Sequence, residues 1–579
     1  MIATLVSAVA MLAFGEPRVE VHAPGSDVRA CAVSRSGKSV LAATAAGLAT
    51  LGPDGQQTGW LTAIEGLPGS EVSALLQIDS THWWVGTEGG LARVRVPVRG
   101  TPVVAQTIET KDVRALSWDG DALLVGTWGA GVLRYDGDAV APLVFEAEAA
   151  SAAQLRITDF ATFDGETLAA TAGAGLWTVG RDQLVARPSV LDDTIVWSID
   201  ADGSQLWVGT LEGLYRGKSR LQRVSGVDAR GVRLSGDTVQ VATVGDGLVS
   251  WSGSTPGKSR TEYAGAVVRA TDMNKGKRCI ATDDGLWIDA GPGTAATAHL
   301  RSAIPSRDIS ATAHDPSTGR LWIGTFDKGL AYHDDTGWHR VEARGVDPQI
   351  NALAVDDAGS VWVATARGLA KLSGDEVTVL GRKAGMPHEH VLSVMVRANG
   401  DVVAGTARGF VIVHEGKVVR ADRARPRERW AVWSVAEDTA GTLWLGTTVG
   451  LIAWPEQEPW RRYSMLDGAL PDNWVTSVVT DGDALWVGTY AAGVVHLRPG
   501  VDDSVVSTVL GGGRINPSGV TIVGEHVYAS TMGGLLRRPR GGSGAWTALD
   551  GLGPGRDTTG VVSVDGELWV ATRRGLGVS

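Results

Sequence analysis

The chain has 579 residues, a formal net charge of −11, 44% hydrophobic residues, 77 glycines and two cysteines. A chain of this length is too long to fold around a single hydrophobic core, so we expect more than one domain. The acidic balance argues against nucleic acid as the main partner, and glycines spread over turns argue against a disordered tract.

The first fifteen residues form an apolar leader. Residues 2–14 carry no charge, and Ala13 and Gly15 provide the small residues of a signal-peptidase site before Glu16. The segment has no Lys or Arg and is too short to span a bilayer. We predict a signal peptide over residues 1–15, a periplasmic or secreted protein and no membrane span. A mis-set start codon or a buried first strand is the alternative.

A motif of the form Leu-Trp-Val-Gly-Thr then recurs fourteen times, at intervals of 33 to 44 residues. A small residue precedes each threonine, an aromatic ring stands three residues before it in eight copies, and a glycine follows at the third or fourth position. The threonines are Thr44, Thr87, Thr127, Thr171, Thr210, Thr243, Thr282, Thr325, Thr365, Thr406, Thr447, Thr489, Thr531 and Thr572. Strand-length apolar runs separated by Asp-Gly turns indicate hairpins, and a period near 40 is typical of β-propeller blades. We expect the aromatic ring to pack between adjacent blades.

Fourteen blades exceed one ring, since propellers hold about four to eight. We predict an all-β fold of two tandem seven-bladed β-propellers with fourteen four-stranded blades, the first in residues 16–300 and the second in residues 301–579; six plus eight blades stays possible. Because the last copy ends after its third strand, a strand from elsewhere must complete it. We predict that residues 18–22 complete blade seven and residues 294–300 blade fourteen. The alternative is a swapped closure in which the N-terminal strand completes blade fourteen.

The two cysteines fall in the first and last blades of the first predicted ring. Cys31 lies in the first strand of blade one and Cys279 in the second strand of blade seven. These blades are neighbours if the ring closes, so a disulfide across the seam is geometrically conceivable. Two separate buried thiols are the alternative.

In a propeller, the loops before the innermost strands and the turns between second and third strands line a funnel on one face. In the second ring these segments place aromatic rings beside amide, carboxylate and guanidinium groups, which suits a sugar or a peptide. The ligand-binding candidates are Arg307, Asp308, Asp347, Asn351, Arg367, His388, His390, Arg408, Arg429, Trp430, Asn473, Trp474, Tyr490 and Arg573, with Phe326, Asp327, Lys328, Asn516 and Arg574 nearby. The first ring offers Glu71, Glu88, Lys111, Arg114, Trp128, Asp193, Trp197, Glu212 and Asp284.

Catalytic and metal-binding signals are few. His388 and His390 lie on one face of an extended segment, but the sequence suggests no third metal ligand. Adjacent aspartates such as Asp192 and Asp193 are typical of turns, where they accept backbone hydrogen bonds. We predict no catalytic residues, no metal and no cofactor.

Residues 321–330 (LWIGTFDKGL) and 443–451 (LWLGTTVGL), with Gly66-Leu67-Pro68 and Gly385-Met386-Pro387, resemble the two-component regulator propeller repeat. The resemblance covers nearly the whole chain after the leader. It implies the periplasmic sensor region of a hybrid histidine kinase, with two seven-bladed propellers that, in Bacteroidetes, recognise oligosaccharides. In those sensors a β-sandwich, a membrane helix and a kinase follow, whereas this sequence stops at Ser579. We therefore expect a stand-alone member without a kinase.

We predict a non-enzymatic ligand-binding or sensory β-propeller protein of the bacterial cell envelope. It would recognise a glycan, peptide or protein and pass the signal to a separate protein partner. One alternative is a polysaccharide hydrolase or lyase with a tandem-propeller cleft, because xyloglucan-degrading glycosidases share that architecture. The other is a structural platform for protein interactions.

Overall fold

The computed structural model describes residues 20–22, 27–52, 56–63, 65–97, 101–145, 154–218, 220–252, 259–294, 296, 298–300, 303–422, 430–456, 459–499, 505–511, 513–541, 544–549, 552 and 556–579. The predicted signal peptide lies outside these residues. Within them the regular structure consists of β-strands and one short 3-10 helix, Arg382–Ala384. The predicted all-β fold is confirmed. None of the described residues forms a helix that is long and apolar enough to cross a membrane.

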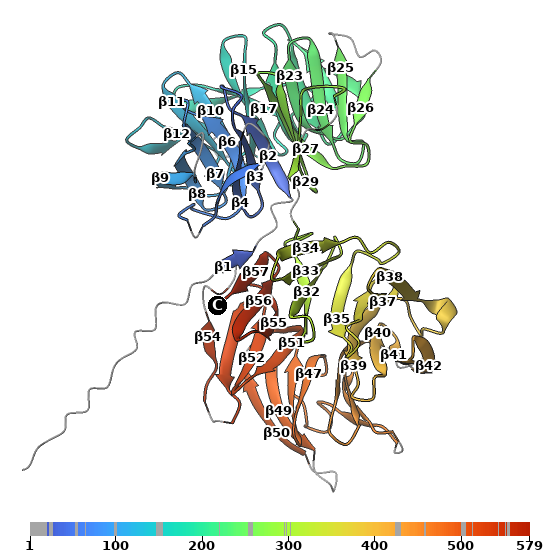
Figure 1. Cartoon of the computed structure of the whole chain (residues 1–579). Helices are drawn as coiled ribbons and strands as arrows, with labels where there is room; N and C mark the ends of the chain where they lie inside the picture. The colour runs from blue at the N-terminus through green and yellow to red at the C-terminus, as the bar shows by residue number, and fades with distance from the viewer. Residues whose placement is uncertain are drawn as a thin grey trace, which may run out of the picture. The chain divides into compact units, whose positions relative to one another are not determined.

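The strands form fourteen sheets in two compact units (Figure 1). The first unit is Pro24–Ser302, and the second unit is Ala303–Ser579 together with Met1–Ala23. Each unit contains seven sheets, mostly four-stranded as in β-propellers, and antiparallel except where β14 pairs with β18 in parallel.

The strands of the first unit, sheet by sheet, are β2 (Val28–Val33), β3 (Val40–Thr44), β4 (Gly47–Leu51) and β5 (Gln57–Leu61); β6 (Val72–Gln77), β7 (His82–Thr87), β8 (Gly90–Arg95) and β9 (Val103–Glu109); β10 (Val113–Asp119), β11 (Ala122–Thr127), β12 (Val132–Tyr135) and β13 (Val140–Pro142); β14 (Val144–Phe145), β15 (Ile157–Phe163), β16 (Glu166–Thr171), β17 (Leu176–Val179) and β18 (Gln183–Arg187); β19 (Val196–Ala201), β20 (Leu206–Thr210), β21 (Leu214–Gly217) and β22 (Gln222–Ser225); β23 (Ala229–Ser235), β24 (Thr238–Thr243), β25 (Leu248–Ser252) and β26 (Arg260–Glu262); β27 (Val268–Asn274), β28 (Lys277–Thr282), β29 (Gly285–Asp289) and β30 (Ala298–Leu300).

Those of the second unit are β31 (Ile309–Asp315), β32 (Arg320–Thr325), β33 (Leu330–Asp334) and β34 (Gly337–Val341); β35 (Ile350–Val355), β36 (Val361–Thr365), β37 (Gly368–Ser373) and β38 (Glu376–Leu380); β39 (Val391–Val396), β40 (Val402–Thr406), β41 (Gly409–His414) and β42 (Lys417–Asp422); β43 (Val432–Glu437), β44 (Leu443–Thr447), β45 (Gly450–Trp454) and β46 (Arg461–Tyr463); β47 (Val475–Asp481), β48 (Ala484–Thr489), β49 (Gly493–Pro499) and β50 (Val505–Gly511); β51 (Ile515–Val523), β52 (His526–Thr531), β53 (Gly534–Pro539) and β54 (Thr547–Leu549); β55 (Thr558–Val564), β56 (Glu567–Thr572), β57 (Gly575–Val578) and β1 (Glu20–His22).

Within each unit the sheets follow one another around a ring. The innermost strand of each sheet contacts that of the next, and the last contacts the first, β27 with β2 and β55 with β31. Apolar clusters fill the space between neighbouring sheets. Trp444 of one sheet, for example, packs in one cluster with Val475 and Val487 of the next. This is the inter-sheet position predicted for the aromatic ring of the repeat.

The recurring threonine closes the turn between the second and third strands. All fourteen hydroxyls donate to the carbonyl of the glycine three or four residues later. Thr325, for example, donates to Gly329 at 2.9 Å and accepts the N–H of Lys328 at 3.0 Å. The hydroxyls are buried, so each bond satisfies a polar group that has lost access to water.

The small residue before the threonine is required by close packing of the next sheet. A Cβ atom on Gly324 would lie 2.4 Å from Cγ2 of Ile350, the first residue of the next innermost strand. On Gly86 it would lie 2.5 Å from Cγ1 of Val113, in the equivalent place. The small residue therefore admits the close approach of the next innermost strand.

The two predicted closing strands were assigned to the wrong sheets. β1 pairs with β57, with Val21 opposite Gly577, so the N-terminal strand completes the last sheet of the second unit. β30 pairs with β29 and completes its own sheet in the first unit. The swapped closure, which we considered as the alternative for the N-terminal strand, is the one observed. It protects the backbone edge of β57 from pairing with other chains.

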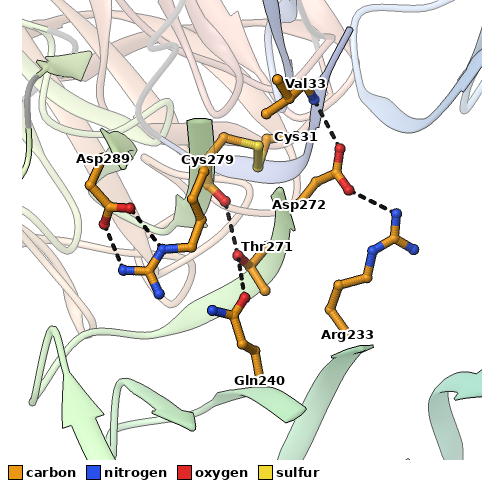
Figure 2. Close-up of a disulfide and its surroundings, with 9 residues drawn as sticks. Cys31, Val33, Arg233, Gln240, Thr271, Asp272, Cys279 and Asp289 are labelled. Carbon is orange, nitrogen blue, oxygen red and sulfur yellow. Dashed lines mark hydrogen bonds and ion pairs between the residues drawn. A yellow bond between two sulfur atoms is a disulfide. The ribbon is translucent and has the colours of Figure 1, made fainter. Parts of the chain in front are cut away.

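The seam of the first unit is closed by side chains and a disulfide (Figure 2). Cys31 on β2 is bonded to Cys279 on β28, with the Cα atoms 6.2 Å apart. Beside it, a carboxylate oxygen of Asp272 accepts the N–H of Val33 at 2.9 Å, and the other accepts from Arg233 at 2.7 Å. The pairing that the sequence allowed is therefore present.

Candidate functional site

One end of each ring is formed by two segments of every sheet, the residues before the innermost strand and the turn after the repeat threonine. In the second unit these segments are joined by backbone hydrogen bonds. The N–H of Phe326 donates to the carbonyl of Asp308, and that of Tyr490 to the carbonyl of Trp474, both at 2.9 Å. We call this end the mouth, because it gathers one such pair of segments from each sheet.

A bulge follows the first residue of every innermost strand. The pairing register skips there in all fourteen sheets, for example between Val432 and Ser434. A bulge turns the skipped side chain out of the strand alternation. Ser310 illustrates the result, since its hydroxyl donates to the carbonyl of Ile350 in the next sheet at 2.6 Å. The skipped residues therefore determine much of the chemistry at the mouth.

In the second unit an aromatic group, Trp433, Trp474 and Tyr490, occupies the mouth between adjacent sheets. Trp474 stacks on Tyr490 with ring centres 4.4 Å apart, and Trp433 lies 5.8 Å from Trp474. The guanidinium of Arg514 lies over the Tyr490 ring at 5.6 Å. All three rings are half-buried, and neither indole N–H has a hydrogen-bond partner among the described residues. The indole nitrogens themselves are buried, so what the group offers to a ligand is the flat apolar surface of its rings.

A charged cluster spans the seam of the second unit. Arg573 forms an ion pair with Asp308 at 2.8 Å and lies 4.0 Å from a carboxylate oxygen of Asp557. Its guanidinium is 5.4 Å from the Phe326 ring, and the amide of Asn516 donates to Asp557 at 2.8 Å. Burial raises the pKa of Asp308, and Arg573 opposes this shift. Two predicted site residues, Asp308 and Arg573, are thus brought into contact from opposite ends of the unit.

A second group of predicted residues lies at the next two sheets, β35–β38 and β39–β42. Arg367, whose side chain is 83% exposed, pairs with Asp347 at 3.3 Å. The N–H of His390 donates to Nδ1 of His388 at 3.0 Å. Burial lowers the pKa of both imidazoles, with Arg408 among the charges that lower that of His388, so both rings are neutral at pH 7. No group of three metal-ligating side chains occurs among the described residues.

Other predicted site residues have structural contacts. Trp430 is 5% exposed and belongs to the hydrophobic cluster that contains Phe410. The amide of Asn351 donates to the carbonyl of Val391 at 2.7 Å, across to the next sheet. Asn473 accepts the backbone N–H of Met465 at 2.8 Å. Arg307 lies directly before Asp308 and is half-buried, whereas Arg429 lies outside the described residues.

Three mouth residues escaped the sequence prediction, namely Trp433, Arg514 and Asp557. Each is adjacent to the first residue of an innermost strand: Trp433 occupies a skipped position, whereas Arg514 and Asp557 directly precede the strand. Counting from that first apolar residue in every repeat would have selected them.

The mouth of the first unit has a different composition, because four of its seven skipped residues are arginines. Arg29 pairs with Glu71 of the next sheet at 2.9 Å, and Arg230 lies over the ring of Trp197 at 4.3 Å. Arg114 pairs with Asp112 at 2.7 Å and lies over the ring of Trp128 at 5.8 Å. The remaining skipped arginine is Arg269. Ion pairs and arginines stacked on indoles line this mouth, so it exposes less aromatic surface than the mouth of the second unit.

Two carboxyls of the first unit, Asp159 and Asp200, have pKa values that burial raises. Burial raises the pKa of Asp159 to about 6. One oxygen accepts the hydroxyl of Ser198 at 2.7 Å and the N–H of Ile199 at 3.0 Å. These contacts join β15 to β19, so Asp159 holds neighbouring sheets together.

No protein-family model and no curated protein matches this chain. Among solved structures, PorZ, an essential bacterial surface component of the type-IX secretion system of Porphyromonas gingivalis, matches with a TM-score of 0.70 and 13% identity over 97% of this chain and 86% of PorZ. An ancestral GH74 enzyme matches with a TM-score of 0.60 and 13% identity over 96% of this chain and 97% of the enzyme. The extracellular domain of a putative hybrid two component system from B. thetaiotaomicron matches at 16% identity with a TM-score of 0.40, over 96% of this chain and 81% of that domain. At these identities the first two matches show the fold alone.

Proposed function

We propose that this chain is a non-enzymatic ligand-binding protein of the bacterial cell envelope, built from two seven-bladed β-propellers of the two-component regulator type. Two closed rings of seven sheets support the architecture. The likeness to PorZ, a bacterial surface component, supports a place in the cell envelope, periplasmic or secreted. A sensory role would have the chain pass its signal to a separate protein partner.

The observation that carries this proposal is the aromatic group at the mouth of the second unit. Its rings are half-buried, so they form a firm surface that a ligand can still reach. A sugar or a peptide presents the flat or apolar surface that stacks on such rings.

The test is a glycan and peptide array probed with residues 16–579, followed by titration of every hit. Trp474→Ala is expected to weaken binding at least tenfold, since a buried aromatic contact contributes about 1.5 kcal/mol or more. Trp460→Ala is the matched control, because it removes an indole that is 40% exposed and stacks on Trp454 at 6.3 Å outside the mouth. Equal binding by both variants, or no binding to any ligand, would contradict the proposal.

One observation favours polysaccharide hydrolysis as a second candidate. Asp308, whose pKa burial raises, shares the guanidinium of Arg573 with Asp557 at the mouth. Glycosidases use two neighbouring carboxyl groups, one as the general acid and the other as the base or nucleophile. If the wild type cleaves a glycan and both Asp308→Asn and Asp557→Asn lose that cleavage, hydrolysis and not ligand binding alone is the function.

A further inference from the structure

A well-anchored loop at the mouth of the second unit precedes the aromatic group. Residues 464–470 follow β46 and lead to the segment before β47. The carboxylate of Asp467 accepts the N–H groups of Ser464 and Ala469, both at 3.0 Å. The N–H of Leu470 donates to the carbonyl of Ser464 at 3.2 Å, and Ala469 and Leu470 are each 4% exposed in a hydrophobic cluster. The base of the loop is therefore held by hydrogen bonds and by packing.

The tip of this loop is apolar and faces water. Leu466 is 89% exposed and Met465 is 54% exposed. The N–H of Met465 donates to the side chain of Asn473 at 2.8 Å, which holds the tip beside the segment that carries Trp474. The exposed pair therefore extends the apolar surface that the aromatic group begins.

The fold does not require an apolar residue at this tip. The loop 381–387 before β39 has a similar form, because the N–H of Met386 donates to the carbonyl of Gly381 and Met386 is 2% exposed. Lys383 stands there two residues before the turn glycine, as Leu466 does, and is also exposed. Since the same position accepts a lysine, packing within the loop does not explain Leu466, whereas a contact with another molecule does.

Exposed apolar side chains of the second unit are concentrated at the mouth. Among its described residues, the exposed leucine, methionine and phenylalanine side chains all belong to the mouth, namely Phe326, Met465, Leu466 and Met532. The other large hydrophobic side chains exposed in the described part of this unit lie on outer strands or directly before one, namely Val379, Val419, Val509 and Trp460. Such a concentration is typical of an interaction site.

Two exposed arginines flank the aromatic group. Arg408 lies in the sheet before that of Trp433, and Arg514 precedes the sheet after that of Trp474. Neither guanidinium forms an ion pair within the part of the chain that the structure describes. Between them, Asp472 accepts two backbone N–H groups, at 3.0 and 2.8 Å, so both of its oxygens are engaged. The two arginines can therefore pair with carboxylates of a ligand.

The mouth of this unit as a whole is cationic. Its lysines and arginines outnumber its aspartates and glutamates by eleven to eight, although the chain carries a net charge of −11. The count covers the described loop residues 303–308, 342–349, 381–390, 430–431, 464–474, 513–514 and 556–557 and the turns 326–328, 366–367, 407–408, 448–449, 490–492, 532–533 and 573–574. A surface of this sign attracts acidic groups.

We propose that the ligand of this mouth, whose existence rests on the function proposed above, is a polypeptide segment that carries both apolar and acidic side chains. Its apolar side chains pack against Leu466, Met465 and the ring of Trp474. Its carboxylates pair with Arg408 and Arg514.

Two other ligand classes fit these residues less well. A neutral glycan stacks on the rings but leaves the aliphatic tip and the two arginines without partners. Insertion of the tip into a lipid bilayer would also bury the exposed carboxylate of Asp467, which lies directly beside Leu466, at a high desolvation cost.

The experiment is a fluorescence titration of residues 16–579 with four labelled synthetic peptides of equal length, in which leucine or serine is combined with glutamate or lysine. The leucine–glutamate peptide is expected to bind about tenfold or more tightly than the other three, and added salt should weaken this binding. Leu466→Ser and the double variant Arg408→Met with Arg514→Met should each weaken it about tenfold or more. Val419→Ser and Arg420→Met are the matched controls, because both change exposed residues of the outer strand β42 (Lys417–Asp422).

The melting temperature of Leu466→Ser should equal that of the wild type, because the side chain is exposed, so a loss of binding in this variant does not reflect misfolding. If a glycan binds and Trp474→Ala removes that binding while Leu466→Ser does not, the polypeptide ligand is refuted and the binding function stands. If no peptide and no glycan binds, both fail. Binding to phospholipid vesicles that Leu466→Ser abolishes, or peptide binding that Leu466→Ser leaves unchanged, would also overturn the proposal.

Discussion

Replacing both Cys31 and Cys279 by alanine is expected to destabilise the first unit and leave the second unit unchanged. The first unit has no strand that crosses its seam, because β30 pairs within its own sheet. The disulfide links its first and last sheets covalently across the seam. The second unit closes by strand pairing between β1 and β57 and contains no cysteine.

The magnitude follows from the length of chain that the disulfide closes. The two cysteines are 248 residues apart, for which loop-closure entropy gives about 5.5 kcal/mol at 25 °C. Measured disulfides rarely exceed about 5 kcal/mol. Two hydrogen bonds also hold the seam together without the disulfide, since Asp272 accepts the N–H of Val33 and Asn274 donates to the carbonyl of Ser34. We therefore expect a loss of about 2–5 kcal/mol from the first unit.

Calorimetry of the oxidised wild type, the reduced wild type and the double alanine variant measures the loss. For a unit of this size it corresponds to a fall in melting temperature of roughly 4–10 °C. Hydrogen exchange locates the loss of stability. In the double alanine variant the amides of β2 and β28 should exchange faster than in the wild type, while those of β31 and β55 should not. Two titratable thiols in the unreduced, denatured wild type, or a shift below about 1 °C in the variant, would refute the reasoning.

Three further predictions test other parts of the fold. Deleting residues 16–23 removes β1, so calorimetry should show a loss of about 2–3 kcal/mol in the second unit and light scattering should show association through the exposed edge of β57. Burial raises the pKa of Asp159 to about 6, so its contribution to the stability of the first unit should be greatest below about pH 4 and fall by about 3 kcal/mol as pH rises through 6. Denaturant titrations should show a weaker dependence of the unfolding free energy on pH in Asp159→Asn. Gly324→Val should cost about 1–3 kcal/mol in a melting experiment, because its Cβ would overlap the side chain of Ile350. Gly381→Val is the control, since Gly381 has a negative φ and nothing within 4 Å of an added Cβ.

The repeat was predictable because one geometry is imposed fourteen times. Thr325 and its counterparts close the same turn with the same hydroxyl bond, and Gly324 and its counterparts admit the next sheet. Each requirement depends on a few neighbouring residues, so it leaves a fixed spacing in the sequence.

The closing strands were not predictable from pattern alone, since both spare strands suited both open edges. The physical difference is loop length. β30 begins nine residues after β29 ends, so pairing within its own sheet closes a short loop at low entropic cost. That pairing leaves β57 as the edge that lacks an outer strand, and β1 pairs there.

The candidate site was predicted in part because the bulge changes which residues face the mouth. Trp430 precedes its strand by two residues and was selected, yet it packs in the core, while Trp433 was passed over because strand alternation places it elsewhere. Asp308 and Arg573 were selected from separate loops, but their ion pair depends on ring closure, which brings together residues 265 positions apart.

The two units share the bulge but differ in the residues that occupy it. A skipped side chain leaves the strand alternation and reaches the next sheet around the mouth, as Ser310 does. In the first unit four of these positions carry arginines, whereas in the second they carry Trp433, Leu392 and mostly neutral polar groups. Because the repeat imposes the same turn and the same close packing in both rings, we expect a ligand to distinguish the two mouths by these residues.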